Sequence, residues 1–237
     1  MSGTAPTKAM VKTSLPIELL PTDLARIITH AHPALLLAAY YIRFSAFVAD
    51  PVQTLLGSLI PLAATQIGYA VLCLPSAGSD KKTVVKKKLN APKKSNNDVA
   101  AKSLTVFFAF VLSLISVPAI AALQILFGAP ITTHLSHTLL GSAHIALLAV
   151  FPLVYVHGAE SSKWREIASL YSPVDEVFGA SVGCLIGAWL GAVPIPLDWD
   201  REWQKWPVTI VTGAYAGYAL GKLVGGSLLK GKRIEFD

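Results

Sequence analysis

Charged residues are scarce in this chain. Asp, Glu, Lys and Arg make up 14% of its 237 residues, whereas 53% of the residues are hydrophobic. A water-soluble domain usually carries about 25% charged residues, so the composition excludes a conventional soluble core. Cysteine is rarer still. Both cysteines, Cys73 and Cys184, fall inside apolar segments, which excludes a disulfide framework in the loops.

Acidic residues are missing from residues 99–159, the stretch that holds three clustered histidines. His134, His137 and His144 would share one helix face at spacings of i, i+3 and i+10. Zinc requires a further ligand and usually a supporting carboxylate, and this stretch provides no carboxylate. The sequence also has no H-E-x-x-H pattern and no P-loop. We therefore predict no metal site, no cofactor and no catalytic residue.

Long apolar runs are what the sequence has instead. A helix needs roughly 20 apolar residues to cross a hydrocarbon core of about 30 Å, and six stretches meet this need. The predicted spans are residues 31–49, 52–75, 103–127, 136–157, 175–197 and 206–229. The expected fold class is therefore all-α, a polytopic membrane protein with about six transmembrane helices.

The distribution of positive charge predicts the orientation. An even number of spans places both termini on one side, which carries 16 Lys and Arg residues against two on the other. Cytoplasmic loops hold the excess of positive charge, so both termini and the Lys-rich loop 76–102 are expected in the cytoplasm. The expected division is a cytoplasmic tail at 1–30 that could include an interfacial helix, a six-span domain at 31–229 and a cytoplasmic tail at 230–237.

A few polar residues lie in or beside the predicted spans. Lys222 is roughly two helical turns from the end of the last span, so its side chain is expected to snorkel to the interface. Asp175 and Glu176 begin the fifth span and His32 the first, where water is expected to reach them. Arg43 lies deeper, and an intramembrane charge needs a partner.

Glycine recurs at every fourth position in the last two predicted spans. The residues are Gly179, Gly183, Gly187 and Gly191 in the fifth span and Gly213, Gly217, Gly221 and Gly225 in the sixth. Each ladder leaves a groove along one helix face, where another backbone can approach closely. The ladders are expected to be packing surfaces, either for each other in an antiparallel hairpin or for a helix of another protein.

The loop between these two spans, residues 194–207, reads PIPLDWDREWQKWP. Asp198 could cap a short helix in which Trp199, Trp203 and Trp206 recur at i, i+4 and i+7, so that all three indoles face one way. Tryptophans at the end of a span usually anchor it at headgroup level. The alternative is a contact surface for a partner or a lipid.

Three segments together resemble the PIG-F family of GPI-anchor biosynthesis proteins. They are the loop Pro196-Leu-Asp-Trp-Asp-Arg-Glu-Trp-Gln-Lys-Trp-Pro207 before a glycine-laddered span, the segment Phe178-Gly-Ala-Ser-Val-Gly-Cys-Leu-Ile-Gly-Ala-Trp189, and Phe127-Gly-Ala-Pro130. The resemblance includes specific motifs over residues 127–225. Over residues 1–126 it is limited to the topology. The Lys-rich loop 81–102 has no counterpart in it.

The resemblance implies a multi-pass protein of the endoplasmic reticulum membrane that acts in GPI-anchor biosynthesis. Family members are non-catalytic subunits that stabilise a large ethanolamine-phosphate transferase, the enzyme that adds phosphoethanolamine to mannose of the GPI precursor. The implied partners are that transferase, membrane lipids and the GPI precursor itself, with no nucleic acid. The implied contact surface is the lumenal loop, with the residues Asp198, Trp199, Asp200, Arg201, Trp203 and Trp206.

Two other classes of function stay open. One is a lipid transporter or flippase that presents the GPI precursor, although such a protein would need a polar path between its spans. The other is a small intramembrane enzyme, which the sequence disfavours because no nucleophile and base are paired in it.

Overall fold

The computed structural model describes residues 14–79, 96–197 and 199–234, and the side chains of 96–98 are not included in the description. Every regular element in these ranges is helical, and none is a strand. The elements are α1 (Asp23–Ile42), α2 (Phe44–Ala49), α3 (Pro51–Cys73), α5 (Asn96–Leu126), α6 (Leu135–Ile145), the π-helical turn η1 (Ala146–Val150), α7 (Phe151–His157), α8 (Ser161–Ala168), α9 (Glu176–Leu190), the 3-10 turn η2 (Glu202–Gln204) and α10 (Val208–Gly226).

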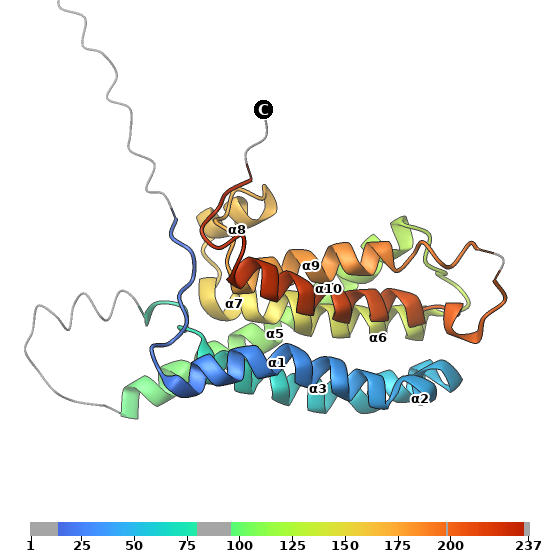
Figure 1. The fold of residues 1–237 in the computed structure, drawn as a ribbon, viewed down its shortest axis with the longest axis horizontal. Helices are drawn as coiled ribbons and strands as arrows, with labels where there is room; N and C mark the ends of the chain where they lie inside the picture. Colours follow the sequence, from blue (N-terminus) through green and yellow to red (C-terminus); the bar gives the residue numbers. More distant parts are fainter. Residues whose placement is uncertain (1–13, 80–95, 198, 235–237) are drawn as a thin grey trace, which may run out of the picture.

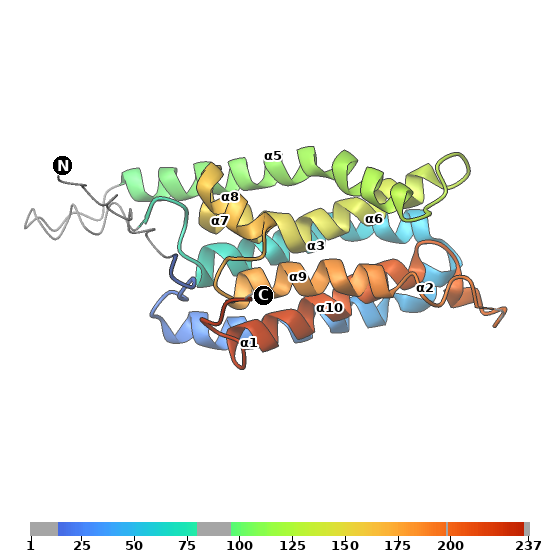
Figure 2. The ribbon, with the colours of Figure 1, turned by 90° about the horizontal axis from the view of Figure 1, so that it is seen from above.

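The long helices lie side by side along one direction, and the chain reverses at the ends of the bundle (Figure 1). Helix α1 pairs with α3, α9 pairs with α10, and α5 runs beside α6 and α7. Figure 2 shows α5 and α10 on opposite sides of the molecule. The helix formed by α6, η1 and α7 is the centre of the core, since residues 144–149 and 151–156 are buried.

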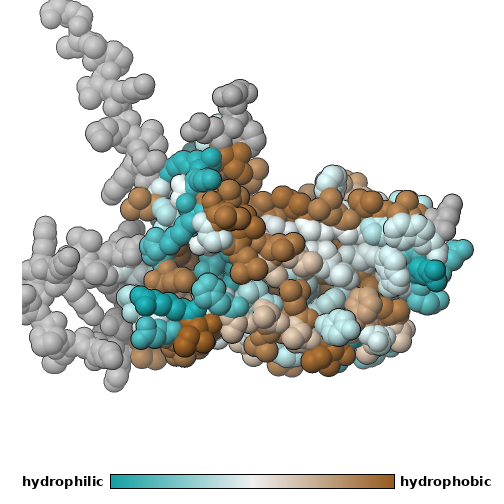
Figure 3. Space-filling model, viewed as in Figure 1, coloured by the Kyte–Doolittle hydropathy of each residue, from teal (hydrophilic) through white to brown (hydrophobic). Residues whose placement is uncertain are grey.

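The lengths and surfaces of the helices are those of a membrane protein. Within the described ranges, three helices are long and apolar enough to cross a bilayer: Pro51–Cys73, Val99–Leu126 and Leu135–His157. Large apolar side chains point outward, with Ile60 and Leu126 each 81% exposed. Hydrophilic residues gather at the two ends of the bundle and hydrophobic ones mostly between them (Figure 3). Such an extensive apolar surface is suited to lipid.

Local sequence explains where the helices begin. The Thr22 hydroxyl accepts a hydrogen bond from the Ala25 amide, and the Asp50 carboxylate accepts one from Gln53 just before Pro51 opens α3. Such caps satisfy amides that have no partner within the helix, and proline suits the first helical position. Helix α1 runs without interruption from Asp23 through Ile42. A break at Arg43 then separates α1 from α2.

Candidate functional site

The two glycine ladders face each other across the interface of α9 and α10. A Cβ atom on Gly183 would lie 2.8 Å from the Cα of Gly221, and one on Gly187 would lie 2.9 Å from the Cα of Gly217. Carbon atoms normally approach to about 3.5–4.0 Å. All eight ladder glycines therefore place backbone directly against backbone, and at the ends Gly191 also faces Thr209 and Gly225 also faces Asp175.

One flank of this interface is an open groove of about 610 Å³. Glycines of both ladders form its floor, and Ile186, Leu190 and Leu220 stand beside them with half or more of their surface exposed. Phe44 of α2 and Trp203 also line it. We call this surface the glycine groove. Its apolar walls and its floor without side chains allow a further helix to pack closely.

The tryptophan loop differs from the expected helix. Helical structure within residues 199–207 is limited to the single turn η2, Asp200 has a positive φ of 47°, and Asp198 lies outside the described residues. The loop instead folds around Gln204. This side chain donates to the Pro194 carbonyl at 2.7 Å and accepts from the Arg201 amide at 2.9 Å.

The prediction that all three indoles face one way is consequently wrong. Trp199 is 53% exposed, and its ring centre lies 5.9 Å from that of Trp203. Trp206 turns into the bundle, where its Nε1 donates to the Thr138 hydroxyl at 3.1 Å. Since only Trp199 is largely exposed, two of the three indoles anchor the loop to the bundle. Asp200 and Arg201 are exposed beside it.

Lys222 and Glu176 form an ion pair inside the helix bundle. The side chain of Lys222 is 2% exposed and that of Glu176 is 13% exposed. Lys222 also lies 3.5 Å from the centre of the Tyr69 ring, and its amine donates to the Thr29 hydroxyl at 3.3 Å. Thr29 and Tyr69 both donate to the Glu176 carboxylate, the latter at 2.9 Å. The expectations of a snorkelling Lys222 and a hydrated Glu176 are therefore wrong, because each charge is neutralised by the other.

The same cluster continues into aromatic and amide groups. His32 is 3% exposed, against the expected hydration, and stacks on Tyr69 with ring centres 4.4 Å apart. Tyr218 contacts His32 edge-on and donates to Gln66 at 3.4 Å. These residues come from α1, α3, α9 and α10. Sequence reasoning missed the cluster because its members lie up to 193 positions apart. The detectable signal was several polar residues within otherwise apolar spans.

The three histidines of the central region do not converge. The imidazole of His144 is buried and hydrogen-bonded to the Tyr215 hydroxyl at 2.9 Å and to the Leu55 carbonyl at 3.0 Å. His134 and His137 lie at the N-terminal end of α6, with ring centres 4.9 Å apart. Within the described ranges, no three residues of the metal-binding types come together. His144 thus acts as a structural side chain of the core.

The letters Gly179-Ala-Ser-Val-Gly183 match the G-x-S-x-G pattern of a nucleophile elbow. That pattern activates serine on a sharp turn between a strand and a helix, whereas these residues lie within α9. The Ser181 hydroxyl is buried and bonded to the carbonyls of Ala149 and Val177 at 2.8 and 2.9 Å. The match therefore follows from the glycine ladder rather than from a hydrolase site.

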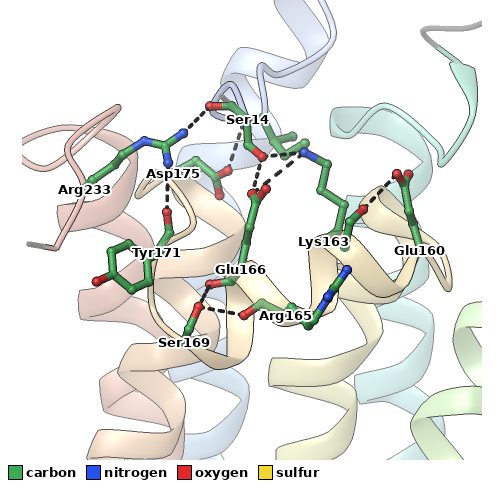
Figure 4. Close-up of polar contacts among 11 residues, drawn as sticks. Ser14, Glu160, Lys163, Arg165, Glu166, Ser169, Tyr171, Asp175 and Arg233 are labelled. Atoms are coloured by element: carbon green, nitrogen blue, oxygen red, sulfur yellow. Dashed lines mark hydrogen bonds and ion pairs between the residues drawn. The ribbon is translucent and has the colours of Figure 1, made fainter. Parts of the chain in front are cut away.

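Polar groups tie the two described ends of the chain together at one end of the bundle (Figure 4). Lys163 of α8 donates to the Ser14 hydroxyl at 2.6 Å, and that hydroxyl bonds Glu166. Arg233 donates to the Ser14 carbonyl at 2.7 Å. Asp175, which caps α9, accepts from the Ile17 amide at 2.9 Å.

Comparison with known proteins places these features in a family. The sequence model of the GPI biosynthesis protein family Pig-F matches residues 31–226. A protein of Neurospora crassa named glycosylphosphatidylinositol anchor biosynthesis protein 11 is 48% identical over 219 residues, which cover 92% of this chain and 80% of the relative. Proteins of the same name in Aspergillus fumigatus and Saccharomyces cerevisiae are 42% and 35% identical, covering 99% and 84% of this chain and 91% and 77% of their own lengths. No solved structure gives a significant match.

Proposed function

This chain belongs to the PIG-F family of GPI biosynthesis proteins, and from that premise we propose its role within GPI-anchor biosynthesis. It is a non-catalytic subunit that stabilises an ethanolamine-phosphate transferase of the endoplasmic reticulum membrane. The transferase adds phosphoethanolamine to mannose of the GPI precursor. The chain itself contributes transmembrane packing surface rather than reacting groups.

The glycine groove is the observation that carries this proposal. It runs along the paired ladders of α9 and α10 and has exposed apolar walls. Within a bilayer, helices associate through close van der Waals packing at small residues, because lipid tails are as apolar as the side chains. A transmembrane helix of the transferase fits such a groove, with its ridge of side chains above the glycine floor.

The proposal includes a topology. The chain crosses the membrane six times, with the transmembrane domain at 31–229 and cytoplasmic tails at 1–30 and 230–237. The contact between Ser14 and Arg233 supports this arrangement, since it holds both described ends of the chain at one end of the bundle. The charge bias of the sequence makes that end cytoplasmic. The tryptophan loop then lies on the lumenal side, near the entrance of the glycine groove.

Co-purification tests the proposal with a matched pair of variants. Ala216 lines the groove and is partly buried, whereas Ala122 is exposed on α5, across the molecule (Figure 2). Ala216→Trp fills the groove above its glycine floor, and we expect it to abolish recovery of a stoichiometric transferase in mild detergent. Ala122→Trp adds the same bulk to the lipid-facing surface and should leave recovery unchanged.

Three outcomes contradict the proposal. The first is a wild-type protein that purifies alone and moves lipid between leaflets, which would favour a transporter. The second is equal recovery of the transferase with both tryptophan variants, which would exclude the glycine groove as the contact. The third is a point variant that abolishes transfer while the complex stays intact and abundant, which would indicate a catalytic residue.

A further inference from the structure

A second cavity lies between α1 and α3, towards the end of the bundle that carries α2. Its volume is about 180 Å³. Leu36, Phe47, Leu55 and Leu62 line it and are buried, so its interior is apolar. Arg43 also lines it, and this residue is exposed. The cavity thus reaches the surface beside a cation.

Arg43 occupies the break between α1 and α2 and reaches across to α3. Its Nη2 lies 3.6 Å from the position that a Cβ atom on Gly57 would take. The guanidinium therefore rests against the backbone of α3 where no side chain stands between them. Among the residues that the structure describes, no carboxylate forms an ion pair with it. Arg43 is consequently a cation available to an external anion.

Several other polar groups of the cavity are engaged within the protein. The hydroxyls of Ser58 and Thr65 donate to the carbonyls of Thr54 and Pro61. His144 is bonded on both ring nitrogens, as described above. The cavity therefore combines an apolar interior with one strong donor at its rim. This combination suits an amphipathic anion rather than a small polar metabolite.

The depth of Arg43 indicates which anion is available. Helix α1 has 20 residues, and at about 1.5 Å per residue it spans about 30 Å, the thickness of a hydrocarbon core. Arg43 thus lies one core thickness from Asp23. In the topology proposed above, on which this step rests, Asp50 lies at the lumenal end of the first span, where Pro51 opens α3. Arg43 precedes Asp50 by about two helical turns, roughly 10 Å, so its long side chain reaches the level of the lumenal headgroups. Phosphodiesters are the anions concentrated at that level.

We propose that this cavity binds a phospholipid of the lumenal leaflet. The lipid phosphate accepts hydrogen bonds from the Arg43 guanidinium, whose planar fork matches phosphate oxygens. The beginning of an acyl chain enters the cavity. An apolar cavity of about 150 Å³ holds a benzene-sized group, so this one holds a short piece of chain while the rest of the lipid stays in the bilayer. The source is either a bulk phospholipid or a glycolipid built on phosphatidylinositol.

The test measures lipid retention by the purified full-length chain with native mass spectrometry. The probes are phosphatidylinositol, phosphatidylethanolamine and diacylglycerol with identical acyl chains. We expect both phospholipids to bind and diacylglycerol, which has no phosphate, to bind far more weakly. Arg43→Gln should weaken phospholipid binding by roughly tenfold to a hundredfold, the range for losing a hydrogen bond to a charged group. Arg43→Lys should restore part of it.

Two matched controls accompany these variants. Arg26→Gln removes an exposed arginine from the other end of α1 and should leave retention unchanged. Ala39→Trp blocks the cavity mouth, whereas Ala38→Trp adds the same bulk at an exposed neighbour that does not line the cavity. Only the former should lower retention. Thermal unfolding in detergent verifies that each variant is folded.

Equal retention by wild type, Arg43→Gln and Ala39→Trp would overturn the proposal, and so would wild-type retention of diacylglycerol equal to that of the phospholipids. Tighter binding of phosphatidylinositol would identify the glycolipid class, and equal binding of the two phospholipids would identify bulk lipid. Transferase recovery measured on the same variants separates this proposal from the previous one. Ala216→Trp should lose the transferase and retain lipid. Arg43→Gln should retain the transferase and lose lipid.

Discussion

Adding one methyl group at Gly187 tests whether the α9–α10 interface depends on its glycines. In Gly187→Ala the new Cβ atom would lie 2.9 Å from the Cα of Gly217 and still closer to the carbonyl of Gly213. Carbon atoms need about 3.5–4.0 Å, and the Gly213 oxygen lies closer than the Cα of Gly217, so the two helices must move apart by about 1 Å or more. Both obstructing groups belong to the backbone, and no side chain can rotate away to relieve the clash.

The expected cost is about 1–3 kcal/mol, the range for overpacking a tight core. Gly68→Ala in α3 is the control. A Cβ atom there meets nothing within 4 Å, and alanine favours a helix over glycine by up to about 1 kcal/mol. Gly68→Ala should therefore be neutral or slightly stabilising. Gly141→Ala, whose Cβ would lie 3.5 Å from a Val211 methyl carbon, should also be tolerated.

We would measure the unfolding midpoint of each purified variant in one detergent. We would then measure the amount of each variant in membranes as a fluorescent fusion. Gly187→Ala should unfold earlier than Gly68→Ala and accumulate less. The double variant Gly187→Ala/Gly217→Ala should cost less than the sum of the single ones, because the first methyl group already separates the helices. Equal midpoints for Gly187→Ala and Gly68→Ala would refute the packing argument.

Three further predictions follow from other contacts. Lys222→Met should destabilise the protein by about 3–5 kcal/mol, because it leaves Glu176 buried without its cation. The double variant Lys222→Met/Glu176→Gln should recover much of that loss. Equal unfolding midpoints for the single and double variants would contradict the ion pair. A glycosylation acceptor in the Lys-rich segment 81–102 should stay unmodified in cells, and one in an enlarged loop 198–205 should be modified. The opposite pattern would reverse the topology. Trp206→Phe should lower stability by about 0.5–1.5 kcal/mol through the lost hydrogen bond, and an unchanged midpoint would place that indole outside the bundle.

The sequence by itself determined the properties that depend on local pattern. Apolar runs of spanning length predicted a helical membrane protein, because backbone groups inside a bilayer must be paired within their own segment. The fourfold spacing of glycines located one packing face on each of two helices. The motifs around residues 127–225 identified the family, which the comparisons confirm. None of these inferences required knowing which helices are neighbours.

Only the tertiary structure decided which surfaces meet. The sequence indicates how deep Lys222 lies in the last predicted span. It does not indicate that Lys222 pairs with Glu176, which lies 46 positions earlier. The tryptophans of the loop 194–207 have helical spacing in the sequence. The loop nevertheless folds around Gln204 without forming that helix, and Trp206 points into the bundle. The glycines face each other because antiparallel pairing of α9 and α10 brings both ladders into register. Long-range contacts are set by the packing of whole helices, and a pattern within one helix carries no information about its neighbour.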